Sequence, residues 1–135
     1  MKLLNVLFLF LFLSGCACEE SGPSDSTLAT NALCKYWWRA NDVDYDGSEM
    51  SILFNFNFDG TGTEIIDRLP AIGTSPPREE HYFKWEWTSD RHRAICIMYG
   101  ENDLSYIDEL FINDRTLTGL LNGQEIKLDG SDKYY

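Results

Sequence analysis

The chain has 135 residues, of which 44% are hydrophobic and 14% aromatic, enough for the core of one domain but not of two. Acidic residues outnumber basic residues by 22 to 11, so the net charge is −11 at neutral pH. This composition excludes a disordered chain, because such chains are poor in large apolar residues. It also argues against nucleic-acid binding, because an acidic surface repels phosphate groups.

The N-terminal segment has the pattern of a secretory signal. Lys2 precedes an almost unbroken apolar run that ends at Leu13. This run is too short to cross a bilayer as a helix, which takes ~20 residues. The next residues complete Leu13-Ser14-Gly15-Cys16, which resembles the lipobox of bacterial lipoproteins without departure. The resemblance implies that residues 1–15 are removed and that Cys16 carries acyl chains such as palmitate. Two or more chains would anchor the protein in the bacterial outer membrane, on its periplasmic or cell-surface side.

Residues 16–32 are predicted to be a flexible tether, because they are rich in Ser, Thr, Gly and acidic residues without an apolar period. With Cys16 lipidated, three cysteines remain, and three cannot pair completely. Secreted proteins form disulfides, so one interpretation is a disulfide, either Cys34–Cys96 or Cys18–Cys34. The alternative interpretation is that Cys34 and Cys96 are small buried residues.

From residue 33 onward the sequence has the period of β-strands. Phe54 and Phe56 alternate with Asn55 and Asn57, which is typical of strands with one face in water. Turn residues separate the apolar runs, and Asn122-Gly123 is a strong two-residue hairpin signal. Eight strands are predicted, over residues 36–40, 50–58, 62–69, 80–88, 94–99, 104–112, 116–121 and 124–128.

Short connections predict that consecutive strands pair in the antiparallel sense, because parallel pairing needs a long crossover. The predicted fold class is therefore all-β, an antiparallel up-and-down meander of about eight strands. Such a meander hides its edges by closing into a small barrel. We expect the barrel to occupy residues 33–129 and a C-terminal tail to occupy residues 130–135.

Several segments of this meander resemble the small lipocalin-like lipoproteins of Bacteroides-type bacteria. In that pattern Leu-x-Gly-x-Trp opens the barrel, and here Lys35 replaces the Gly. The resemblance implies a lipocalin-like or calycin-type fold, and it supplies no activity. The matching segments are residues 33–37, 56–62, 83–87, 95–97 and 117–119.

Aromatic residues give the main candidate site. One interpretation is a cup lined with rings that binds a small apolar or sugar ligand. The other is a filled core, because an eight-stranded barrel is just wide enough to be filled by its own side chains. Trp37 and Trp38 are adjacent, so in a strand they face opposite ways and one of them lies outside. The predicted cup residues are Trp37, Phe54, Phe56, Trp85, Trp87 and Tyr99.

Asp42, Asp44 and Asp46 alternate and are followed by Gly47, as in the first half of a calcium-binding loop. The twelfth position of such a loop is Glu, and here it is Leu53. A low-affinity Ca²⁺ site is one interpretation, and a solvated acidic hairpin loop is the other. No further cofactor is expected.

No motif of an activated nucleophile, a zinc site or a phosphate loop occurs, and His81 and His92 are expected at the surface. The sequence therefore predicts a non-catalytic envelope lipoprotein. Its lipocalin-like domain would bind a small ligand or, alternatively, act as a protein–protein interaction or inhibitor module of an envelope complex.

Overall fold

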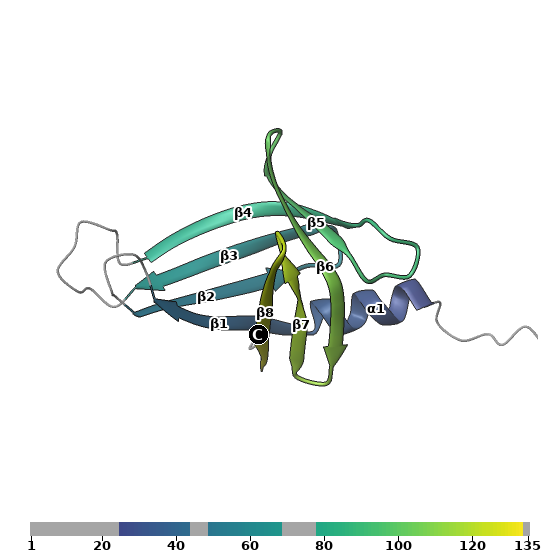
Figure 1. Ribbon diagram of the computed structural model, residues 1–135, viewed down its shortest axis with the longest axis horizontal. Helices are drawn as coiled ribbons and strands as arrows, with labels where there is room; N and C mark the ends of the chain where they lie inside the picture. The colour runs from purple at the N-terminus through teal and green to yellow at the C-terminus, as the bar shows by residue number, and fades with distance from the viewer. Residues whose placement is uncertain (1–24, 44–48, 69–77, 134–135) are drawn as a thin grey trace, which may run out of the picture.

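The computed structural model describes residues 25–43, 49–68 and 78–133 (Figure 1). One helix, α1 (Asp25–Cys34), precedes eight antiparallel strands, each paired with the next, and β8 pairs with β1 to close the barrel. The predicted all-β meander is therefore confirmed. The strands are β1 (Tyr36–Val43), β2 (Glu49–Phe56), β3 (Thr61–Arg68), β4 (Arg78–Trp87), β5 (Ile95–Gly100), β6 (Asp103–Asn113), β7 (Thr116–Leu121) and β8 (Gln124–Asp132).

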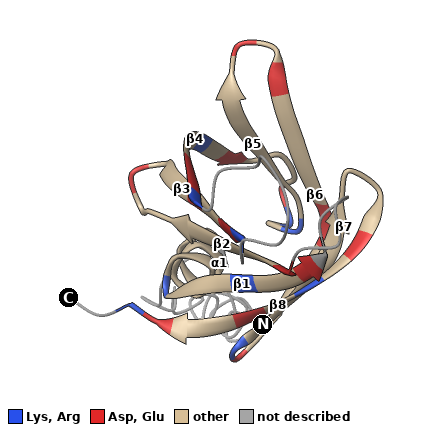
Figure 2. Cartoon of the chain, turned by 90° about the vertical axis from the view of Figure 1, so that its left-hand side faces the viewer, with Lys and Arg blue, Asp and Glu red and all other residues tan. Residues whose placement is uncertain are grey.

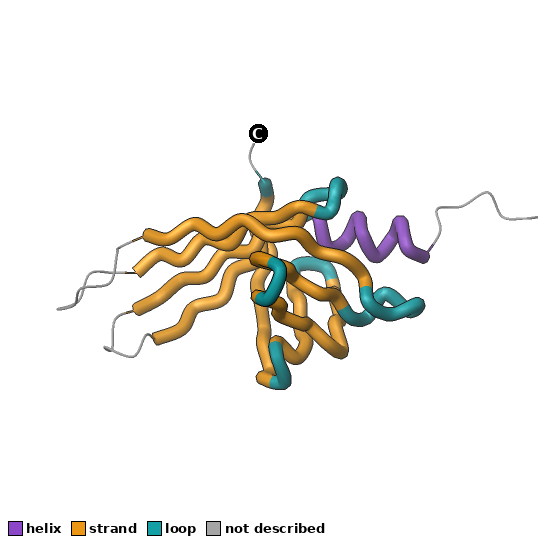
Figure 3. The backbone as a smooth tube through the Cα atoms, turned by 90° about the horizontal axis from the view of Figure 1, so that it is seen from above, coloured by secondary structure: helices purple, strands orange, loops and turns teal. Residues whose placement is uncertain are grey.

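The barrel is closed along only part of its length. Strand β1 pairs with β8 over residues 36–39, and β4 pairs with β5 over residues 84–87. We call the region around these pairs the closed part. Beyond it, β1 to β4 continue as a four-stranded sheet, the open part, while the β5–β6 hairpin turns away from it (Figure 1). Helix α1 lies at the opposite end of the molecule (Figure 3).

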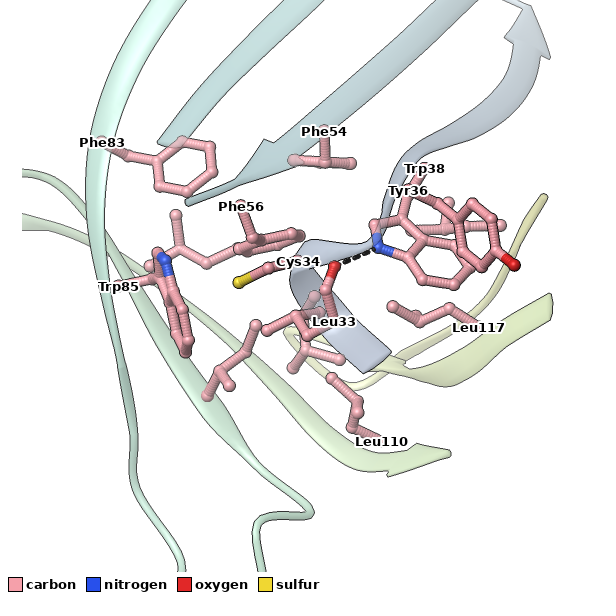
Figure 4. Packing of buried hydrophobic residues seen from close by; sticks show 14 residues of the cluster. Leu33, Cys34, Tyr36, Trp38, Phe54, Phe56, Phe83, Trp85, Leu110 and Leu117 are labelled. Atoms are coloured by element: carbon pink, nitrogen blue, oxygen red, sulfur yellow. Dashed lines mark hydrogen bonds between the residues drawn. The ribbon is translucent and has the colours of Figure 1, made fainter. Parts of the chain in front are cut away.

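The core fills the closed part (Figure 4). Trp38 and Phe56 are fully buried, and the Phe56 ring packs at 5.8 Å from Trp85 and 5.4 Å from Phe83. Apolar residues of the later strands complete the cluster. Those that are fully buried are Ile95, Ile97, Ile107, Leu117 and Leu128.

Helix α1 closes the barrel end. Its last two residues, Leu33 and Cys34, are buried in the core, whereas Leu28 is exposed. Two indole N–H groups tie the helix to the barrel: Trp38 donates to the Leu33 carbonyl at 2.8 Å, and Trp87 donates to the Thr30 hydroxyl at 3.0 Å. The prediction of a flexible tether through residue 32 is therefore wrong for residues 25–32. Only the end of this helix is buried, so no apolar period marks it in the sequence.

The last strand is longer than predicted. Strand β8 continues through Asp132, and Gly130 and Ser131 pair with Trp38 and Trp37 of β1. A Cβ atom on Gly130 would lie only 3.0–3.1 Å from the rings of Tyr36 and Trp38, so glycine permits this close approach. The prediction of a tail from residue 130 is therefore wrong through residue 132. Among the described residues no helix has the length and apolarity to cross a membrane.

The described cysteines, Cys34 and Cys96, are both free and buried. Cys34 lies in the core at the helix end. Cys96 faces the other side of the barrel wall, in register with Glu86 and Tyr106. Of the interpretations left open, the Cys34–Cys96 disulfide is therefore wrong, and that of small buried residues is confirmed for this pair. Burial raises the pKa of the Cys34 thiol to about 11. Cys18 lies outside the described residues.

Candidate functional site

The six aromatic residues predicted to line a cup separate into three groups. Phe54, Phe56 and Trp85 are buried core residues that pack against one another and their neighbours. Trp87 is partly buried beside the core and donates a hydrogen bond to helix α1. These four side chains fill the closed part of the barrel.

Trp37 was predicted to face the interior, and this prediction is wrong. Trp38 is in register with Phe54 and fully buried, whereas Trp37 is in register with Asn55 and half-buried on the outer face. Residues directly opposite in an antiparallel pair point to the same side of the sheet. The pair of adjacent tryptophans thus divides as expected, with the second one inside.

Tyr99 is the predicted residue that does not fill the core. The register of β5 against β6 shifts between Met98 and Gly100, which places Tyr99 in a β-bulge. Bulges bend a strand and redirect a side chain. Here the Tyr99 ring packs against Phe83, at 5.6 Å between centroids, and its hydroxyl donates a hydrogen bond to the Glu64 carboxylate.

An open cleft lies where β4 separates from the β5–β6 hairpin. Its apolar section has a volume of about 760 Å³, with Phe83 and Met98 among its lining residues. Its polar section has a volume of about 570 Å³ and is lined by Glu64, Asp103 and their neighbours. Tyr82 and Tyr99 line both sections, so the two form one cleft in the side of the barrel.

Acidic groups dominate the polar section. Glu64 faces inward, in register with the core residue Phe54, and burial raises the pKa of its carboxyl group, while the Tyr99 hydroxyl and His81 oppose that rise. Glu80 and Asp103 add two more carboxylates. Figure 2 shows acidic residues on β4 and at the tip of the β5–β6 hairpin. The cleft therefore combines aromatic walls with negative charge.

Two nearby basic groups pair with one other carboxylate, whereas Lys84, which lines the apolar section, makes no ion pair with a described residue. Arg68 lies 3.0 Å from Glu79, and His81 lies 3.8 Å from the same carboxylate. In the described part of the chain, no ion pair involves Glu64, Glu80 or Asp103. The cleft is therefore suited to a cationic or amphipathic partner more than to an anionic one.

Tyr82 is the most exposed aromatic residue of the cleft, with 71% of the residue's surface accessible. Its hydroxyl lies 3.2 Å from the Glu80 carboxylate and donates to it. Neither Tyr82 nor Glu64 was among the predicted site residues. The sequence does contain a signal for Glu64. It is an acidic residue at an inward-facing position of β3, where Gly62 and Ile66 are its neighbours on the same face.

The predicted calcium loop lies largely outside the described residues. Asp42 is exposed near the end of β1, while Asp44 and Asp46 fall in the segment that the structure does not describe. Within the described ranges no group of three or more metal-ligating side chains is present. Cys16, the predicted lipidation site, also lies outside the described residues.

Comparison of the chain with models of known families, with curated proteins and with solved structures finds no match.

Proposed function

We propose that this chain is a non-catalytic interaction domain, held at the outer membrane by lipid on Cys16, whose open cleft binds a protein partner. The lipobox-like tetrapeptide supports the anchor. The choice of a protein partner rests on one observation: the closed part of the barrel is filled by its own side chains, while the exposed ring of Tyr82 borders an open cleft. An enclosed apolar cavity would have favoured a lipocalin-like carrier of small molecules.

A small ligand is the second candidate, and the apolar section of the cleft supports it. About 760 Å³ lined in part by Phe83, Met98 and two tyrosines is enough space for a compact apolar or sugar ligand. Such a ligand would sit in the side of the barrel, because the space between Phe54, Phe56 and Trp85 is occupied by the rings themselves.

Site-specific photocrosslinking in the native envelope tests the proposal. A benzophenone amino acid replaces Tyr82 in the full chain, and a matched protein carries it at Phe111, an exposed ring on β6 that does not line the cleft. We expect discrete protein conjugates from position 82 that are missing from position 111. Equal conjugates at both positions, or none at 82, would overturn the proposal. Mass spectrometry that finds only a small molecule attached at 82 would replace it with the second candidate.

The anchor has its own test. Cys16→Ala removes the sulfur that the acyl chains require, and the matched control is Cys18→Ala. We expect Cys16→Ala to leave the membrane fraction and Cys18→Ala to remain in it. If Cys16→Ala partitions with membranes as fully as the unaltered chain does, the anchor is wrong.

A further inference from the structure

Strand β4 has a free edge along the cleft. All of its residues from Arg78 to Lys84 pair with β3, but its pairing with β5 begins only at Lys84. Among the strands that the structure describes, residues 78–83 therefore have a neighbour on one side only. In Figure 1 the β5–β6 hairpin rises away from this half of β4.

The hydrogen bonds of β4 show which backbone groups the free edge presents. The Trp85 N–H donates to the Gly60 carbonyl, at 2.8 Å, so Trp85 turns its backbone groups toward the β3 side. These directions alternate along a strand, and β4 has no register shift against β3 or β5. Tyr82 and Glu80 therefore turn their N–H and C=O groups away from β3, toward the cleft.

Unpaired backbone groups of this kind are a template for another strand. Natural proteins that reject such pairing cover the edge, shorten it or place charges on it. The charges at this edge are carboxylates, which repel an acidic strand and attract a basic one. Here the edge is bordered by the cleft described above, which Tyr82 and Tyr99 line in both of its sections.

The charges around the edge indicate the sequence that would pair with it. Glu80 lies on the edge itself, and Glu64 and Asp103 line the inner side of the cleft. None of these three carboxylates takes part in an ion pair with a described residue. The whole chain has a net charge of −11, which attracts basic segments over a longer range.

We infer that an extended, basic segment of a partner protein adds as a strand to the free edge of β4, with its Lys or Arg side chains on the inner face, against Glu64 and Asp103. This inference rests on the proposed function and names the chemistry of its partner. Main-chain hydrogen bonds supply the affinity in this mode of recognition, and alternate side chains supply the specificity.

The test uses a synthetic peptide of alternating Lys and Val, with both ends capped, and measures its binding to the lipid-free chain by fluorescence anisotropy. Two isomers are N-methylated at alternate residues, one on each edge of the extended peptide. We expect one isomer to bind at least about tenfold more weakly, through loss of several main-chain hydrogen bonds, and the other to bind as the parent does. A peptide with Glu in place of Lys should show no binding.

Substitution in the protein gives the complementary evidence. Tyr82→Pro removes an N–H that points away from β3, and proline is tolerated at such an edge position. Tyr82→Ala keeps that N–H and loses the ring. We expect Tyr82→Pro to bind the peptide more weakly than Tyr82→Ala does, with the β-sheet circular dichroism of both variants unchanged. Should Tyr82→Pro fail to fold, the two methylated isomers still decide the question.

The outcomes separate this inference from the function on which it rests. Equal binding by both methylated isomers, or dimerisation of the chain through this edge in place of peptide binding, overturns strand addition. Lack of peptide binding together with protein conjugates at position 82 overturns the inference and leaves the proposed function standing. Lack of both overturns the two together.

Discussion

Strands β1 to β4 run through both the closed part and the open part of this barrel, and the two parts differ in what covers these strands. In the closed part, β1 to β4 pack against β5 to β8 and the end of α1, so rings such as Phe56 and Trp38 are fully buried. In the open part β1 and β4 have no partner from β5 to β8 among the described residues, and Glu64 and His81 take the inward places along β3 and β4. Stability is therefore concentrated at one end of each strand, and the capacity for binding at the other.

Phe56→Ala should break the closed part and have the largest effect. The ring contacts Phe54, Phe83 and Trp85 and is fully buried, so its removal leaves a cavity among other rings. We expect a loss of about 3–5 kcal/mol in the free energy of unfolding. Denaturant unfolding measures it. Phe58→Ala, which removes a ring that is 66% exposed two residues further on, should change the free energy by less than about 0.5 kcal/mol.

Trp38→Phe should weaken the attachment of helix α1 to the barrel. The substitution removes the indole N–H that donates to the Leu33 carbonyl and leaves that buried acceptor without its partner. We expect a loss of about 1–3 kcal/mol in the free energy of unfolding. Trp37→Phe is the matched control, since this neighbour is half-buried on the outer face. An equal loss in the two variants would contradict the assignment of Trp38 as the inward residue.

The sequence predicts the closed part well and the open part poorly, for physical reasons. Alternating rings and turn signals such as Asn122-Gly123 are local, and both residues of that turn adopt the positive φ that a tight hairpin requires. No apolar period marks helix α1, because it is buried only at its end, and alternation alone does not say whether Trp37 or Trp38 faces the core.

The cleft could not be predicted from local patterns either. It exists because β4 pairs with β5 over residues 84–87 only, and because a bulge at Tyr99 turns the hairpin away. Both are properties of long-range register. The closing strand β8 likewise extends over Gly130 and Ser131, residues whose types are typical of turns, because they pair with β1 at the other end of the chain.

Glu64→Gln sharpens the comparison at the boundary between the two parts and should have the smallest effect on stability. Glu64 is in register with the core residue Phe54, and burial raises the pKa of its carboxyl group above the ordinary 4.5. The folded chain therefore binds this proton more tightly than the unfolded chain does. The stabilisation that comes from this protonated carboxyl group is complete below pH 4.5, and it is lost as the pH rises through the raised pKa.

Glutamine carries no charge at any pH, and its side-chain oxygen can still accept the hydrogen bond that the Tyr99 hydroxyl donates to Glu64. We therefore expect the Tm of Glu64→Gln to exceed that of the unaltered chain at neutral pH, and the difference to shrink to nothing below pH 4.5. Glu125→Gln, on the exposed side of β8, should show no such pH-dependent gain. A lower Tm for Glu64→Gln at neutral pH would mean that a cation in the chain compensates the Glu64 charge. The cleft would then lack the uncompensated carboxylate that a basic partner requires.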